Sequence, residues 1–448
     1  MLAALLVQPV LAQQSLAIKA GRIITMSGEP IEGGTILIRD GQITAVGKDL
    51  EIPVEAKVID ASDKVVMPGF VEAHSTDGMG QANETNPIVP YVSVMDEINP
   101  MDPYFQEARR NGITTVAITP GNSTMIGGQA AVLKTGGEFV DSMVLSTDTG
   151  IKISLRPVRG SRMSHMAKLR ETLDDAKRKM EKKAGKEAKA AEAESEADSN
   201  DTERGAGRRG RRRGPQAADP AAQEEEESDD SKEKETKEEK TIESELDKAM
   251  FALLSGQLPA IIYCEKAMDV GAALRLIEEY QLKAKLVLGR ECYKAAQQVA
   301  DAKLPVILDP ELVFWEEDPR TKEETKVVLP QVYQEHQVPY TFQVGRSNSR
   351  SLGRNYLWYQ AATAVKYGMP EQQALEALTI LPAKFHGIEG LVGSIEEGKD
   401  ADLVILSGDP LKIDTWVETT IVNGEVVYEK EEDEQLQKML TGEDQNSK

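Results

Sequence analysis

The residues best suited to chemistry lie in Met67–His74, where a hydrophobic strand opens through Pro68-Gly69 and ends by presenting His74. A neutral imidazole at a strand end can bind a divalent metal, because its ring nitrogen donates a lone pair without adding charge. Thr76 follows two positions later, on the same face of the strand, where a second histidine would complete a pair of ligands. The segment therefore offers His74 as one isolated candidate for a metal ligand.

Histidine and cysteine, which supply the nitrogen and sulfur ligands of metal ions, are scarce in the chain. Besides His74 there are three histidines, and we expect His165 and His336 to be surface or capping residues and His386 to be structural. The two cysteines, Cys264 and Cys292, are too few for a disulfide framework and are expected to be buried. A rebuilt site using Cys264 stays open as an alternative, although its side chain should face away from that of its strand neighbour Tyr263.

The elements around these residues alternate between strands and helices. Repeated strand–helix units indicate a parallel sheet, and about eight of them suit a (β/α)8 barrel with its chemistry at the carboxyl strand ends. We assign residues 67–385 to this α/β, TIM-like barrel. Its clearest expected strands after the first are Gly112–Ile118, Pro259–Cys264, Ala284–Leu288, Leu304–Leu308 and Val338–Val344.

Both ends of the chain carry short strands. Alternating apolar residues flank Asp40-Gly41 near the start and Asn423-Gly424 near the end, and both dipeptides are typical of tight hairpin turns. Neither terminal piece could cover its apolar face alone. We therefore expect residues 15–66 and 386–430 to form one small composite β-sandwich, followed by an acidic polar tail over 431–448.

A charged segment over residues 177–241 interrupts the barrel. It contains almost no apolar side chain larger than alanine, so it cannot bury enough surface to offset the entropy of ordering it. We expect a low-complexity insertion, disordered or partly helical near its entrance at Arg170–Lys182. Its Arg208–Arg213 block adjoins many carboxylates, and the chain has a net charge of −22, so no nucleic-acid partner is expected.

The first residues raise a question of targeting. Residues 1–14 include the apolar run Leu2–Leu11 and a small-residue segment before Gln13, which together resemble the remnant of a signal peptide. We expect a periplasmic or secreted protein, with a cytoplasmic one as the alternative. The rest of the sequence contains no apolar run long enough for a transmembrane helix.

Taken in order, these motifs resemble those of the amidohydrolase superfamily, in particular its imidazolonepropionase-like members. The resemblance covers the chain apart from its first dozen residues and the charged insertion. It rests on the opening hairpin, the first barrel strand, a glycine-rich loop and a closing signature: Ala17–Gly21 with Gly41–Gly47, Met67–His74, Gly121–Gln129, and Leu381–Lys384 with Gly390–Leu403.

The resemblance implies a water-activating divalent metal and a last-strand aspartate as general base. Lys152 matches the position of the family's strand-four lysine, whereas Tyr263 and Leu288 fall where the histidines of strands five and six are expected. The last strand offers Gln343 and Arg346 but no aspartate. We therefore expect zinc or a similar metal to be absent or weakly bound, and no residue is assigned a catalytic role.

Two functions follow from this comparison. The first is a hydrolase of non-peptide carbon–nitrogen bonds in cyclic amides; the second is a non-catalytic pseudoenzyme that binds a small molecule or a partner. Either would place a small-molecule ligand at the barrel mouth, where Glu72, Lys152, Tyr263 and Arg346 are the candidate binding residues. Self-association, or pairing with an active homologue, is a possible mode of assembly.

Overall fold

The computed structural model describes residues 15–201, 244–345 and 355–441. The expected signal-peptide remnant, the arginine block and Arg346 lie outside these ranges.

The centre of the molecule is an eight-stranded sheet in the order β14-β11-β10-β9-β8-β7-β6-β5. Its strands are β5 (Phe70–Ser75), β6 (Ile113–Ile118), β7 (Ile126–Lys134), β8 (Val144–Ser154), β9 (Ala260–Cys264), β10 (Ala284–Leu288), β11 (Val306–Ile307) and β14 (Tyr340–Thr341).

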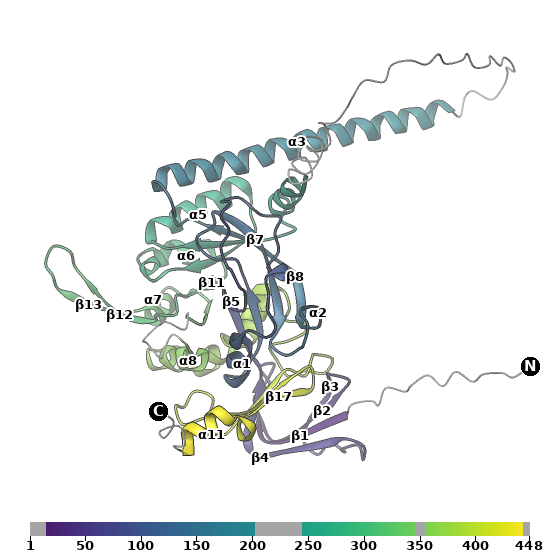
Figure 1. The fold of residues 1–448 in the computed structure, drawn as a ribbon, viewed down its shortest axis with the longest axis vertical. Coiled ribbons are helices and arrows are strands. Elements are labelled where there is room, and N and C mark those ends of the chain that lie inside the picture. The colour runs from purple at the N-terminus through teal and green to yellow at the C-terminus, as the bar shows by residue number, and fades with distance from the viewer. Residues whose placement is uncertain (1–14, 202–243, 346–354, 442–448) are drawn as a thin grey trace, which may run out of the picture.

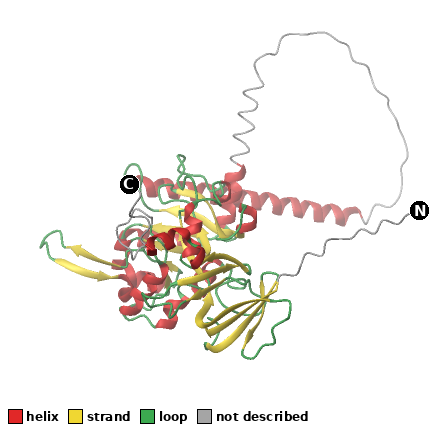
Figure 2. Cartoon of the chain, turned by 60° about the horizontal axis from the view of Figure 1, so that its bottom comes forward, coloured by secondary structure: helices red, strands yellow, loops and turns green. Residues whose placement is uncertain are grey.

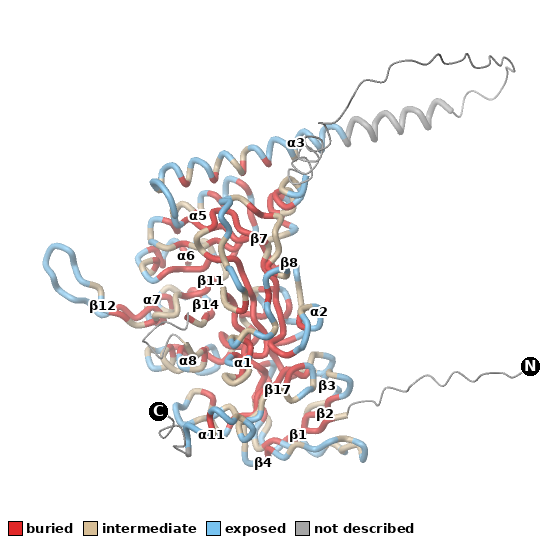
Figure 3. Tube along the Cα trace, viewed as in Figure 1, coloured by how far each residue is buried: buried red, intermediate tan, exposed pale blue. Residues whose placement is uncertain are grey.

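Helices cover the outside of this sheet (Figure 1). They are α1 (Pro103–Arg110), α2 (Val140–Met143), α5 (Ala267–Tyr280), α6 (Ala296–Ala302), α7 (Leu329–Glu335), α8 (Leu357–Lys366), α9 (Glu371–Glu376) and α10 (Ile380–His386). The main core lies between sheet and helices and includes outward residues such as Ile262 and Leu286. A smaller cluster from the alternate strand positions, including Ala73, Ile261 and Val287, fills the space inside the sheet. In Figure 3 the buried chain follows these central strands.

The barrel departs from the regular parallel arrangement at one strand. β7 pairs antiparallel with both β6 and β8, whereas the other neighbouring pairs of this sheet are parallel. The expectation of uniformly parallel strand–helix units is therefore wrong here. The physical reason is the short connection: residues 119–125 bring the chain straight back beside β6, without a crossover helix to return it to the other end.

The sheet is nearly closed between β5 and β14. No backbone ladder joins these two strands, but the segment before α10 lies between them. Val71 N–H donates to Leu378 O at 2.8 Å, and the Thr341 hydroxyl donates to Ala377 O at 2.6 Å. β14 is shorter than the strand expected over Val338–Val344, and this bridging segment replaces part of its pairing.

Both chain ends contribute to the second sheet, as expected, but their strands form one sheet where a sandwich of two sheets was expected, because β4 pairs with strands from both ends. Its order is β17-β16-β15-β4-β1-β2-β3, in one continuous seven-stranded sheet. The strands are β1 (Ser15–Ile23), β2 (Ile31–Arg39), β3 (Gln42–Gly47), β4 (Lys57–Pro68), β15 (Leu403–Leu406), β16 (Val417–Val422) and β17 (Glu425–Glu429). β4 pairs with β1 and then with β15, so the two halves share one core rather than forming two separate sheets. Figure 2 shows this composite sheet beneath the barrel.

Both hairpin predictions are confirmed. Asp40 and Gly41 have φ of 51° and 81° between β2 and β3, and Asn423 and Gly424 have φ of 51° and 76° between β16 and β17. Positive φ at both central residues is what a type I′ turn requires, and Asn or Asp followed by Gly tolerates it.

Two features project from the body of the molecule (Figure 1). One is α3 (Arg162–Asp201), which is helical over the expected Arg170–Lys182 stretch and continues to Asp201, and which packs Leu169 and Leu173 into the main core. The other is a two-stranded hairpin of β12 (Val313–Glu317) and β13 (Glu324–Val328). Within the described ranges, no helix has the length and apolarity needed to cross a membrane.

Candidate active site at the barrel mouth

Two basic side chains meet inside the barrel at the carboxyl ends of its strands. His74 lies near the end of β5 and Lys152 near the end of β8, and both are buried. The Lys152 Nζ atom is 2.8 Å from His74 Nε2. In barrels of this kind the carboxyl strand ends carry the chemistry, so this contact marks the first candidate site.

The environment of this pair disfavours positive charge. Burial lowers the pKa of Lys152 to about 7. The pKa of His74 lies well below its ordinary value, first because of burial and then because of the neighbouring Lys152 charge. A hydrogen bond with the Gln343 side chain acts in the opposite direction on His74. The imidazole is therefore neutral near pH 7, and an amine with a lone pair is accessible beside it.

Tyr263 lies next to the pair, near the end of β9. Its ring centroid is 5.7 Å from Lys152 Nζ, and its side chain is half-buried. Burial raises the pKa of the Tyr263 phenol, so the hydroxyl stays protonated and can donate a hydrogen bond. Cys264 faces the outer core instead, as the strand alternation predicts, and its carbonyl accepts a bond from the Cys292 thiol at 3.1 Å.

The expected role of Leu288 is corrected by the strand register. Tyr263 pairs with Val287 across β9 and β10, and both belong to the inner cluster, while Leu288 belongs to the outer core. The strand-six residue beside Tyr263 on the inner face is therefore Val287. A shift of one residue along a strand exchanges the two faces, and sequence spacing alone did not fix which of the two pointed inward.

Glu72 is buried on β5 but makes its contacts away from the pair. Its carboxylate accepts from the Tyr104 hydroxyl at 2.7 Å and from Val344 N–H at 3.1 Å. Burial raises the pKa of Glu72 to about 8, partly offset by these hydrogen bonds. Glu72 thus ties α1 to the chain after β14.

The structure brings Lys152, Tyr263 and His74 together, places Glu72 beside a different partner, and does not describe Arg346.

A second buried lysine–histidine pair lies deeper in the barrel and escaped the sequence analysis. Lys285 Nζ on β10 donates to Thr149 O at 3.0 Å and lies 3.2 Å from His386 Nδ1 on α10. His386 Nε2 is 2.8 Å from Ala73 O, so Nε2 carries the proton and Nδ1 accepts from Lys285. The one available signal was a lysine within the apolar run Ala284–Leu288.

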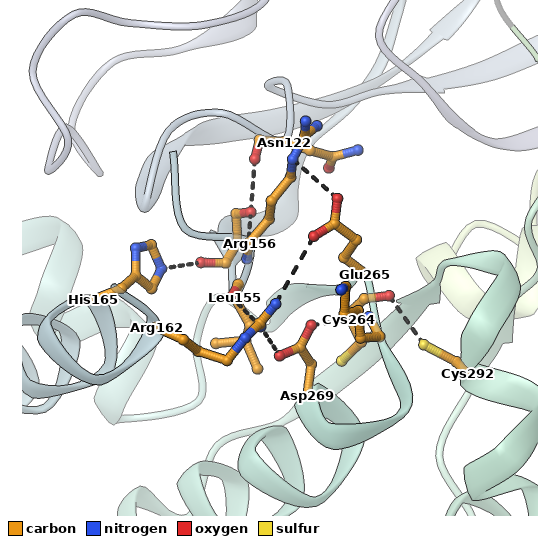
Figure 4. A network of polar contacts seen from close by, with 11 residues as sticks. Asn122, Leu155, Arg156, Arg162, His165, Cys264, Glu265, Asp269 and Cys292 are labelled. Atoms are coloured by element: carbon orange, nitrogen blue, oxygen red, sulfur yellow. Dashed lines mark hydrogen bonds and ion pairs between the residues drawn. The ribbon is translucent and has the colours of Figure 1, made fainter. Parts of the chain in front are cut away.

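A polar network ties the start of α3 to the barrel rim (Figure 4). Arg162 contacts Asp269 on α5 and donates to Leu155 O, and Arg156 pairs with Glu265 at 3.1 Å. His165 is buried here rather than on the surface, because its Nε2 bonds to Ser154 O at 2.8 Å, one turn into α3. These contacts hold the start of α3 against the barrel rim.

Fold and site together define an α/β-barrel protein whose polar groups gather at the carboxyl strand ends. The amidohydrolase family model matches residues 345–427. An amidohydrolase structure from Thermotoga maritima MSB8 is 26% identical, covers 93% of this chain and 100% of that chain, and superposes with a TM-score of 0.71. These findings support membership of the amidohydrolase superfamily.

Two curated relatives extend the comparison. The amidohydrolase tasK of Hapsidospora irregularis is 24% identical over 418 residues, which is 86% of this chain. The chain spans 39% of that relative's length. An imidazolonepropionase of Symbiobacterium thermophilum is 36% identical over 77 residues, covering 13% of this chain and 18% of the relative.

Proposed function

We propose that this protein hydrolyses non-peptide carbon–nitrogen bonds in cyclic amides, with Lys152, His74 and Tyr263 as its reactive centre. The observation that carries the proposal is the 2.8 Å contact between Lys152 Nζ and His74 Nε2 inside the barrel. The relatives named as amidohydrolases and the short match to an imidazolonepropionase support the reaction class and the ring-shaped substrate.

The residues at this mouth do not fit the divalent metal of the family. Within the described ranges, no three His, Cys, Asp or Glu side chains gather as a set that could hold a metal ion. The one imidazole there directs Nε2 at a lysine, and its inner-face neighbours on the fifth and sixth strands are Tyr263 and Val287. A neutral phenol is a poor ligand and valine is none. This donor set supports a substituted metal site, and we route no step through a metal.

Ring-opening hydrolysis makes two demands on the side chains. Water oxygen adds to the carbonyl carbon and gives up a proton, and the ring nitrogen takes a proton as the carbon–nitrogen bond breaks. The hydrogen-bonded Lys152–His74 pair can accept the first proton and return one to the nitrogen. The Tyr263 hydroxyl can donate to the carbonyl oxygen as negative charge develops on it.

The test is a screen of five- and six-membered cyclic amides and imides with purified full-length protein. We expect turnover that falls at least about 100-fold in Lys152→Met and His74→Gln, in keeping with the loss of proton transfer, and less in Tyr263→Phe. Lys285→Met is the matched control, since it removes a buried barrel lysine outside the site and should keep turnover at similar fold content.

Two outcomes would contradict the proposal. Turnover that depends on one tightly bound zinc, iron or manganese per chain would restore the metal mechanism. Thermal stabilisation by a small anion, without turnover of any ring, would favour the alternative function, a non-catalytic module that binds a small molecule or a partner.

A further inference from the structure

A cavity of about 510 Å³ lies at the other end of β5 from His74, where the barrel meets the composite sheet. Phe70, at the start of β5, forms part of its wall, together with residues of α8, the β15–β16 connection and α11 (Glu434–Thr441). Figure 1 shows α8, α1 and α11 next to one another in this region. Small-molecule sites commonly have volumes of ~300–1,000 Å³ and occur at domain seams.

Aromatic and aliphatic side chains line this cavity, which we call the seam cavity; its aromatic residues are Phe70, Tyr356, Trp358, Tyr359, Trp416 and Tyr428. On the barrel side, the rings of Trp358 and Tyr359 lie edge to face with centroids 5.7 Å apart. Trp416 and Tyr359 are 44% and 38% exposed. When a flat apolar molecule displaces water from the faces of such rings, the buried apolar surface makes the free energy of binding more favourable.

Arg110 is the charged residue of the cavity wall, and its charge is already paired with Asp433. Arg110 holds Asp433 through two bonds of 2.6 and 3.1 Å, and Lys430 pairs with Glu418 at 2.9 Å while its Nζ lies 4.8 Å from the Trp416 ring centroid. A charged ligand would compete with the Arg110–Asp433 pair, an anion by displacing Asp433 and a cation by displacing Arg110. The balance therefore favours an uncharged ligand.

We propose that the seam cavity is a binding site for a neutral, planar aromatic molecule, separate from the site at the barrel mouth. Its volume suits one molecule with two or three fused rings, stacked against the aromatic residues of the wall, whose polar edge can reach Asn111. This inference does not depend on the proposed hydrolase function.

Tryptophan fluorescence offers a direct test, because two of the three tryptophans, Trp358 and Trp416, line the cavity. Quinoxaline, a neutral and planar probe, should quench full-length protein saturably, and calorimetry should give the same dissociation constant. Trp416→Leu and Tyr359→Leu should each weaken binding about five- to tenfold through lost stacking and buried area. Turnover at the barrel mouth, where present, should not change.

The matched control is Trp315→Leu, which removes a tryptophan 63% exposed on the projecting β12–β13 hairpin and should leave binding unchanged. Absence of saturable binding at millimolar quinoxaline would overturn the inference. Equal affinity for 2-naphthoate or N-methylquinolinium would overturn the charge argument on which it rests. A dimer in sedimentation that Trp416→Leu dissociates would instead assign this surface to contact between copies.

Discussion

Replacing Lys134 by methionine should destabilise the joint between barrel and composite sheet. Lys134, at the end of β7, is buried, and its Nζ lies 2.7 Å from Asp402 Oδ2 and 2.9 Å from Asp400 Oδ2. Asp402 is also buried, whereas Asp400 is partly exposed. The substitution keeps the apolar stem and leaves the Asp402 carboxylate buried without its counter-charge.

Removing one partner of a buried ion pair costs about 3–5 kcal/mol. Asp402 would keep two hydrogen bonds, from the Thr115 hydroxyl at 3.3 Å and from Asn423 N–H at 2.9 Å. These bonds place the expected loss near the lower end, at about 3 kcal/mol. Urea unfolding of wild type and Lys134→Met, followed by circular dichroism at pH 7, measures the difference.

Two further variants make the reasoning refutable. Lys134→Met combined with Asp402→Asn removes the uncompensated charge while keeping the carbonyl that accepts from Asn423, so it should recover most of the lost stability. Lys322→Met breaks the exposed pair with Glu317, 2.7 Å long, and should change stability by less than about 0.5 kcal/mol. A loss below about 1 kcal/mol in Lys134→Met, or no recovery in the double variant, would refute the argument.

Three other predictions concern packing, pH and the barrel closure. Gly69→Ala should destabilise by about 2–3 kcal/mol in urea unfolding, because an added Cβ would lie 2.1 Å from Thr114 Oγ1. Gly28→Ala, with open space at its Cβ, is the control. Burial lowers the pKa of Lys285 from 10.5 to about 8, so the unfolded chain binds more protons between these values and wild-type stability should rise with pH. Relative to Lys285→Met, that rise should reach about 3 kcal/mol between pH 7 and 10.5, and equal pH profiles would contradict it. Thr341→Val should lower the free energy of opening between β5 and β14 by about 1 kcal/mol, because it removes the 2.6 Å hydrogen bond to Ala377 O and leaves that carbonyl unpaired. Hydrogen exchange at Val71 and Leu378 measures this opening, and unchanged protection at both would count against the bridging role.

Local patterns in the sequence predicted the parts of the fold that depend on the conformational preferences of neighbouring residues. Alternating apolar residues around Asp40-Gly41 and Asn423-Gly424 gave both hairpins, because only a few residues tolerate positive φ in such turns. The apolar ends of the chain also predicted their shared core, since neither could bury its own surface. The position of Lys152 on the fourth barrel strand was implied by the family resemblance and agrees with the strand order.

The tertiary structure alone decided which side chains meet. Lys152 and His74 are 78 positions apart, and Lys285 and His386 are 101 apart, so neither contact leaves a trace in local periodicity. The inward direction of Val287 rather than Leu288 came from its register with Tyr263, and the reversal of β7 came from a short return connection. The sequence shows which residues of a strand alternate between its two faces. The pairing between strands decides which of these faces points into the barrel, and therefore which residues form the site.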